Sequence, residues 1–208
     1  VISLDTNEFV RLSIKEVIKT LFEAIVLVVL VVYLFLQSFR TTIICSVAIV
    51  VSLVATFAGM LALGFSINLL TLFGLVLAIG LVVDDAIVVV ENVERNIERG
   101  LTPHDATIQA MREVSGPIIA IALVLCAVFV PLAFVPGLSG RFYQQFAVTI
   151  AISTVISAFN SLTLSPALSA ILLRSHDAPK DRLTRGMDRV FGGFFRWFNG
   201  WFGRRSAA

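Results

Sequence analysis

Two adjacent carboxylates, Asp84 and Asp85, lie inside the apolar stretch 69–90, which contains no Lys, Arg or His. Placing one carboxylate at the centre of a membrane helix costs about 2.5 to 3.5 kcal/mol. Like charges in a low dielectric resist joint ionisation, so one proton can bind and leave near neutral pH. Because ionisable groups inside a membrane are functional by default, the pair predicts a site that loads and releases protons.

The composition indicates that these carboxylates belong to a membrane protein. Of the 208 residues, 58% are apolar and 14% are charged, and the mean hydropathy is +0.95, far outside the range of soluble domains. Five runs are long enough to cross a hydrocarbon core about 30 Å thick. They are 21–39, 42–63, 69–90, 117–134 and 146–173. The predicted fold is all-α, a polytopic bundle of five transmembrane helices.

Basic residues flank the predicted spans unevenly. One side holds twelve of them, namely Arg40, three in the segment 91–116 and eight in the tail 174–208, whereas the opposite side holds three in the lead 1–20 and Arg141. By the positive-inside rule, the segment 91–116 and the tail face the cytoplasm. The predicted divisions are therefore a lead-in on the opposite side (1–20), a transmembrane domain (21–173) and a cytoplasmic segment (174–208). The net charge of +2 does not indicate a nucleic-acid surface.

The tail contains one further predicted element. Apolar residues recur at helical spacing between positions 187 and 202, with basic residues elsewhere on the wheel. This pattern predicts an amphipathic helix that lies on the cytoplasmic membrane surface.

The two aspartates point in different directions, because successive helical residues are about 100° apart. Asp85 shares a stripe with Gly74 and Ala78, and Asp84 shares another with Gly80. A small residue allows a neighbouring helix to approach closely and bring a partner. Each carboxylate is therefore predicted to be sheltered from lipid by another helix.

Helix-end signals follow the aspartates. The third helix is predicted to continue through polar residues into the cytoplasm until Gly100 stops it. Thr102 and Pro103 then predict the start of another helix, with Asp105 at its third position.

No second chemistry is indicated by the sequence. Cys45 and Cys126 fall within apolar spans, where a thiol packs as a hydrophobe and no disulfide is indicated. His104 and His176 are far apart, so no metal-ligand constellation is visible. We expect no cofactor, no metal and no enzyme activity; protons are the expected coupling ion of a secondary active transporter.

Two accessory candidates leave alternatives open. Glu23, at the outer end of the first span, either helps to relay protons or is simply hydrated. Pro166, in the last span, removes a helical hydrogen bond next to several hydroxyl residues, and it forms either a hinge or a static kink.

The stretch 80–95, GLVVDDAIVVVENVER, resembles the fourth transmembrane helix of resistance-nodulation-division (RND) multidrug exporters. Further similar stretches are 22–25, 33–37, 64–68, 129–134 and 162–168. The resemblance implies transmembrane helices two to six of a twelve-helix pump in the inner membrane of Gram-negative bacteria. It also implies that Asp84 and Asp85 are proton-relay residues of a drug/proton antiporter.

The resemblance carries expectations about partners. In this family the relay aspartates pair with a lysine on a helix of the second half, and no predicted span here contains a Lys. The chain is therefore expected to be a fragment whose residues 1–20 lead in from a missing porter domain. The intact member would be a homotrimer in the lipid bilayer, joined to a periplasmic adaptor and an outer-membrane channel. It would export hydrophobic or amphiphilic drugs.

Alternatives to this interpretation differ in what they require. A transmembrane scaffold or assembly piece needs no titrating aspartates, and an ion-conducting module would conduct without substrate. Relatives in the superfamily export metals, lipids or protein, but the metal exporters typically have a single aspartate at this place. The two adjacent acids therefore favour the hydrophobe and amphiphile branch.

Overall fold

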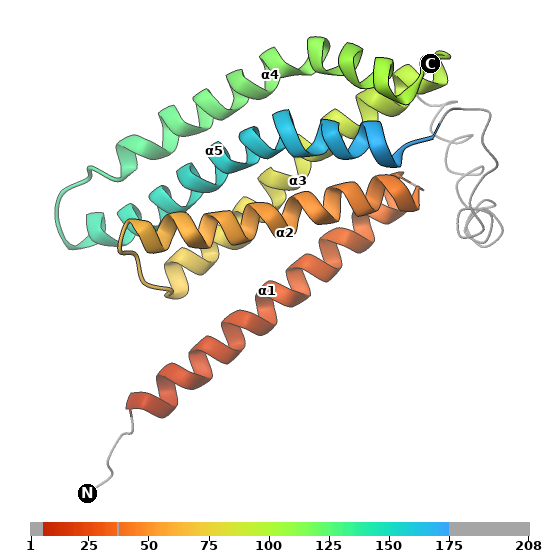
Figure 1. Ribbon diagram of the computed structural model, residues 1–208. Coiled ribbons are helices and arrows are strands. Elements are labelled where there is room, and N and C mark those ends of the chain that lie inside the picture. The colour runs from red at the N-terminus through yellow and green to blue at the C-terminus, as the bar shows by residue number, and fades with distance from the viewer. Residues whose placement is uncertain (1–5, 37, 175–208) are drawn as a thin grey trace, which may run out of the picture.

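The computed structural model describes residues 6–36 and 38–174, and in this part of the chain every regular element is an α-helix (Figure 1). The helices are α1 (Thr6–Leu36), α2 (Phe39–Ala62), α3 (Leu69–Glu98), α4 (Pro103–Leu132) and α5 (Leu138–Leu172). All five are long and apolar enough to cross a membrane. The predicted all-α membrane bundle is confirmed. The amphipathic helix predicted between 187 and 202 lies outside the described residues.

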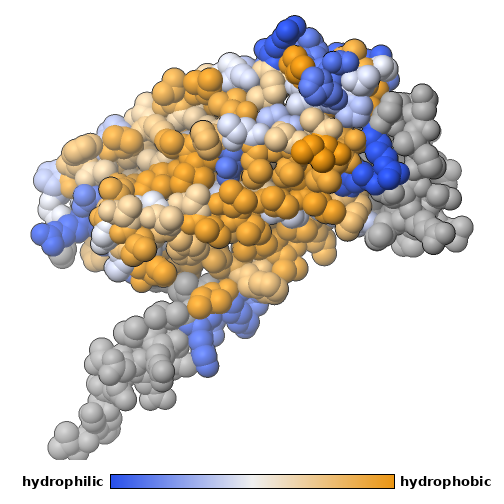
Figure 2. All heavy atoms as spheres, viewed as in Figure 1, coloured by the Kyte–Doolittle hydropathy of each residue, from blue (hydrophilic) through white to orange (hydrophobic). Residues whose placement is uncertain are grey.

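Three of the helices form a bundle around α5. This helix packs against α2, α3 and α4, whereas α1 meets α2 and α3 at one end and diverges from them along the rest of its length (Figure 1). Figure 2 shows hydrophobic residues across the middle of the visible face and hydrophilic residues gathered towards its ends. This distribution suits a bundle whose body faces lipid.

One end of the bundle is tied together by polar contacts. The Nη1 atom of Arg40, at the start of α2, donates to the carbonyl of Leu172 at the end of α5 (2.8 Å). The Nη2 atom of Arg95 lies 2.9 Å from Oε2 of Glu113, which joins α3 to α4. This end is the one that the basic residues assign to the cytoplasm.

The predicted helix ends around Gly100 are confirmed. Helix α3 ends at Glu98, and Gly100 has a φ of 95°, in the left-handed region that favours glycine. Helix α4 begins at Pro103, and the Thr102 hydroxyl accepts a hydrogen bond from the backbone N–H of Asp105 (3.2 Å).

Three helices begin well before the apolar runs that predicted them. Helix α1 starts at Thr6, α4 runs unbroken from Pro103 through Pro117, and α5 starts at Leu138. A hydropathy run locates only the part of a helix that matches the hydrocarbon core, whereas the backbone hydrogen bonds continue through polar residues beyond it. The predicted spans are therefore correct in number and order, and the helices extend beyond them.

Candidate functional site

The start of α3 is held by a capping box. The Oδ1 atom of Asn68 accepts from the backbone N–H groups of Leu70 (2.9 Å) and Thr71 (3.0 Å). The Thr71 hydroxyl in turn accepts from the Asn68 N–H (2.9 Å). The Asn68 amide also donates to the side chain of Gln145 on α5. This contact ties α3 to α5 at the end of the bundle opposite the contact between Arg95 and Glu113.

A close approach of α3 and α5 lies on the same stripe as Asp85. A Cβ atom added at Gly74 would lie 3.2 Å from both the carbonyl oxygen of Phe146 and Cβ of Thr149. Ala78, one turn further along α3, is 2% exposed. The prediction that small residues on this stripe admit a neighbouring helix is confirmed, and the neighbour is α5.

Asp85 is half-buried at this interface. Its Oδ2 atom accepts a hydrogen bond from the hydroxyl of Ser157 on α5, at 2.6 Å. Ser157 is 1% exposed, so this bond is shielded from solvent. The structure thus gives Asp85 a partner on a helix 72 residues further along the chain.

Asp84 has different surroundings, because its side chain is exposed. Phe73, Leu77, Gly80 and Val88 are exposed on the same side of α3, and nothing lies within 4 Å of a Cβ added at Gly80. Within the described residues, no helix covers this side. The neighbour predicted next to Gly80 is therefore absent from this part of the chain. Asp85 faces the interior of the bundle, and Asp84 faces away from it.

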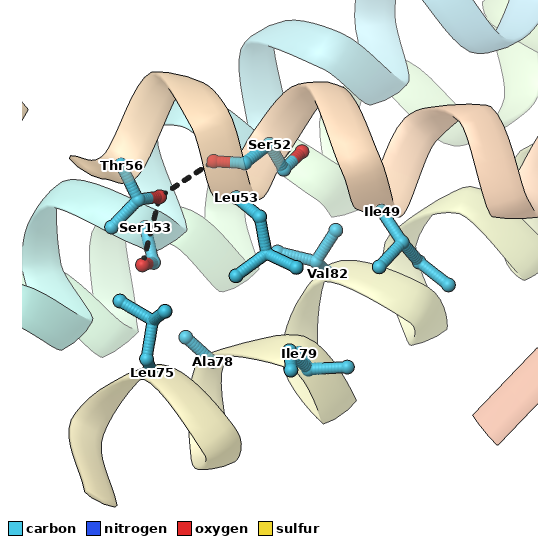
Figure 3. Close-up of a pocket in the computed structure, with 9 residues that line it drawn as sticks. All are labelled: Ile49, Ser52, Leu53, Thr56, Leu75, Ala78, Ile79, Val82 and Ser153. Carbon is cyan, nitrogen blue, oxygen red and sulfur yellow. Dashed lines mark hydrogen bonds between the residues drawn. The ribbon is translucent and has the colours of Figure 1, made fainter. Parts of the chain in front are cut away.

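Polar side chains join α2 to α5 on either side of Ser157, and we call them the α2–α5 polar seam. They are Ser52, Thr56, Ser153 and Asn160. The Ser153 hydroxyl donates to Oγ1 of Thr56 (3.1 Å), and Thr56 donates to the carbonyl of Ser52 (2.7 Å), as Figure 3 shows. The Asn160 amide donates to the Ser52 hydroxyl (2.7 Å). Ser153 and Asn160 lie about one turn on either side of Ser157.

A small cavity of about 10 Å³ lies beside the seam. Apart from Ser52, Thr56 and Ser153, its walls are aliphatic, and Figure 3 shows these side chains coming from α2 and α3. A space of this size holds about one water molecule. The cavity is too small for an organic substrate, and neither Asp85 nor Ser157 lines it.

The accessory candidates lie apart from the contact between Asp85 and Ser157. Glu23 is exposed on α1, with Oε1 3.9 Å from Nζ of Lys19. Pro166 is buried within α5, and the helix continues through it to Leu172. Both roles stay predictions. Cys45 and Cys126 are free thiols, and no group of metal-binding side chains occurs among residues 6–36 and 38–174.

Two polar contacts were not predicted from the sequence. The sequence relates the hydroxyl residues of α5 only to the kink at Pro166, yet Ser157 contacts Asp85, and Ser153 and Asn160 contact α2. The spacing of Ser153, Ser157 and Asn160 by four and three residues was the available signal for one polar face. Glu94, in the polar part of α3 beyond the apolar run, is partly buried and accepts from the Thr41 hydroxyl at the start of α2.

Comparison with known proteins gives consistent matches over the chain. The model of the AcrB/AcrD/AcrF family matches residues 1–208. The multidrug export protein AcrF of Escherichia coli K12 is 53% identical over 94% of the chain. Two transporters of Pseudomonas putida are similarly close: the solvent-resistant pump membrane transporter SrpB is 48% identical over 96% of the chain, and the toluene efflux pump membrane transporter TtgB is 50% identical over 94%. The matches span only 18% of the length of each relative.

Proposed function

The chain belongs to the AcrB/AcrD/AcrF family, and from that membership we propose that it is part of a proton-driven efflux pump in which Asp84 and Asp85 carry the protons. The relatives named above are RND export proteins of Gram-negative bacteria. The five apolar helices are long enough to cross the inner membrane, where such pumps lie. The pump is a secondary active antiporter that exchanges protons for drugs.

The observation that carries the proposal is the placement of the two carboxylates at the middle of α3. Asp85 faces α5 and accepts from Ser157, whereas Asp84 faces outwards. A proton that binds to Asp85 removes the charge from the hydrogen-bond acceptor and weakens its bond to α5. Proton binding is thereby linked to the packing of α3 against α5, and such a link is what energy coupling requires.

The proton gradient supplies enough energy for export. One charge that crosses the full membrane field yields about 2.3 kcal/mol per 100 mV. At a potential of ~150 mV, one proton yields ~3.5 kcal/mol, which supports a solute gradient of a few hundredfold.

The exposed side of α3 leaves space for a further helix, which we propose carries the partner of the aspartates. A helix from the second half of the transporter, carrying a lysine, would cover the exposed stripe of Gly80, Asp84 and Val88 and pair with the carboxylates. We further propose that the complete pump is a homotrimer joined to a periplasmic adaptor and an outer-membrane channel. Its substrates are hydrophobic and amphiphilic compounds, in line with the multidrug, solvent and toluene exporters among the relatives.

Drug efflux from cells that carry the complete exporter tests the proposal. Asp84→Asn and Asp85→Asn each remove an ionisable group and retain its size. We expect at least one of them to abolish efflux while the amount of protein in the membrane and the assembled trimer stay unchanged. Asp105→Asn, the same change at an exposed aspartate in the first turn of α4, is the matched control and should pump like wild type.

Normal efflux by both membrane variants would contradict the proposal. The aspartates would then be structural groups, as the scaffold alternative requires. Collapse of the proton gradient should stop efflux by the wild-type protein, and continued pumping without the gradient would also refute proton coupling.

A further inference from the structure

We propose that Ser157 is the positioning residue of Asp85: it holds Oδ2 of this carboxylate and sets how readily Asp85, rather than Asp84, takes up a proton. The inference rests on the proposed proton-carrying role of the aspartates and adds a residue of α5 to it. Ser157 acts through Asp85 and carries no proton across the membrane itself.

The geometry of the contact is that of a hydrogen bond to a charged acceptor. The 2.6 Å between Oγ of Ser157 and Oδ2 of Asp85 lies within the range of O–H···O⁻ bonds, about 2.5 to 2.7 Å. Ser157 is 1% exposed, so water does not compete for the donor. In a low dielectric, such a bond stabilises the ionised carboxylate more strongly than it would in water.

The surroundings of Ser157 hold its part of α5 in place. Ser153 and Asn160, about one turn away on either side, are both bonded to α2, which prevents this face of α5 from rotating. On the other side, the close approach at Gly74 sets the distance between α3 and α5. The donor is therefore held by two neighbouring helices at once.

The same arrangement distinguishes the two aspartates. Asp84 is exposed, and within the described residues it has no side-chain donor, whereas Asp85 is half-buried against one. Two adjacent carboxylates in a low dielectric do not ionise together readily. Ser157 donates to Asp85 and not to Asp84, so its hydrogen bond favours the charge on Asp85 over the charge on Asp84.

Ser157 has an alternative acceptor when Asp85 is protonated. The carboxylate then gains a proton from water and loses its charge, and no covalent bond forms at the serine. Helical hydroxyls can donate to the carbonyl four residues earlier, as Thr56, Thr149 and Ser169 do here. The Ser157 hydroxyl can turn in the same way to the carbonyl of Ser153, so no buried donor is left without a partner.

The test uses the complete exporter in proteoliposomes. The initial rate of transport of a fluorescent amphiphilic dye is measured against pH at a fixed proton gradient. In Ser157→Ala, the carboxylate has lost its donor, so we expect the midpoint of the pH profile to move by about one pH unit towards alkaline pH. Ser157→Thr keeps the hydroxyl and should keep the wild-type midpoint. Thr154→Val removes a buried α5 hydroxyl that has no hydrogen-bond partner in the described part of the chain, and it should also leave the midpoint unchanged.

An infrared titration provides a second readout, which does not depend on transport. The carboxyl band of Asp85 is identified by its loss in Asp85→Asn, and in Ser157→Ala it should titrate at a more alkaline pH than in wild type. An unchanged midpoint in Ser157→Ala, or an equal shift in Ser157→Thr or Thr154→Val, overturns the inference. If Asp85→Asn stops efflux but Ser157→Ala titrates like wild type, only the positioning role fails. If both Asp84→Asn and Asp85→Asn pump normally, the proposed function itself fails.

Discussion

A hydroxyl inside a membrane helix always has a near acceptor, the carbonyl one turn before it. Thr42, Ser46 and Thr149 use that acceptor here. Ser153 and Ser157 instead donate to side chains of other helices. Since a local bond is available to every helical hydroxyl, an interhelical bond holds one helix against another and does more than satisfy a polar group.

At the scale of single residues, two threonines with the same substitution should behave differently. Thr56→Val removes the acceptor of Ser153, and we expect a loss of about 0.5 to 1 kcal/mol in the free energy of unfolding. This loss lowers the melting temperature relative to that of wild type. Thr154→Val removes a hydroxyl without a partner in the described residues, so its melting temperature should equal or exceed that of wild type.

The measurement is the temperature at which half of the detergent-solubilised exporter remains monodisperse. Equal melting temperatures for the two valine variants would show that the bond from Ser153 to Thr56 contributes nothing to stability.

At the scale of helices, the capping box of Asn68 can be tested separately from the apolar packing of α3. Asn68→Ala removes the acceptor for two backbone N–H groups and should cost about 1 kcal/mol. Asn68→Asp keeps the acceptor oxygen and should retain most of the cap. Hydrogen exchange at the first turn of α3 is the direct readout, and equal protection in the two variants would contradict the role of the cap.

The close approach of α3 and α5 yields another prediction at this scale. Gly74→Leu forces a side chain against the Phe146 carbonyl and Thr149, and overpacking of this kind costs about 1 to 3 kcal/mol. Gly116→Leu is the control, because nothing lies within 4 Å of a Cβ added at Gly116. A lower melting temperature is expected for the first variant only. A melting temperature of Gly74→Leu equal to that of wild type would show that the interface adapts.

The helices were more predictable than their contacts. Apolar runs, Gly100 and Thr102 are local signals, and they predicted five spans and the turn between α3 and α4 correctly. The bond from Ser157 to Asp85 depends on the register of two helices that are 72 residues apart. Hydroxyls occur on several faces of α5, so spacing alone did not show which of them would meet the aspartate.

At the scale of the whole molecule, the open side of α3 predicts where the complete exporter assembles. Gly80→Leu adds a bulky side chain where the described residues leave space, so the packing of α1 to α5 should be unaffected. In the complete exporter, the same side chain should block the helix proposed to cover Asp84 and lower efflux at least tenfold, since a misplacement of about 1 Å can cost a hundredfold in activity.

Efflux at matched membrane abundance, with Gly116→Leu as the control, measures this effect. Wild-type efflux by Gly80→Leu would mean that no helix packs closely on this side of α3.

The outward position of Asp84 also has a consequence for the biogenesis of the protein. While the covering helix is still being synthesised, α3 would present a carboxylate to the acyl chains on its uncovered side. Release of α3 into the bilayer is therefore unfavourable until that helix covers the carboxylate, and we expect the insertion machinery to retain α3 for that time. A chain released too early would expose the Asp84 carboxylate to lipid, whereas the complete exporter would cover it. Membrane quality control could recognise this exposed carboxylate.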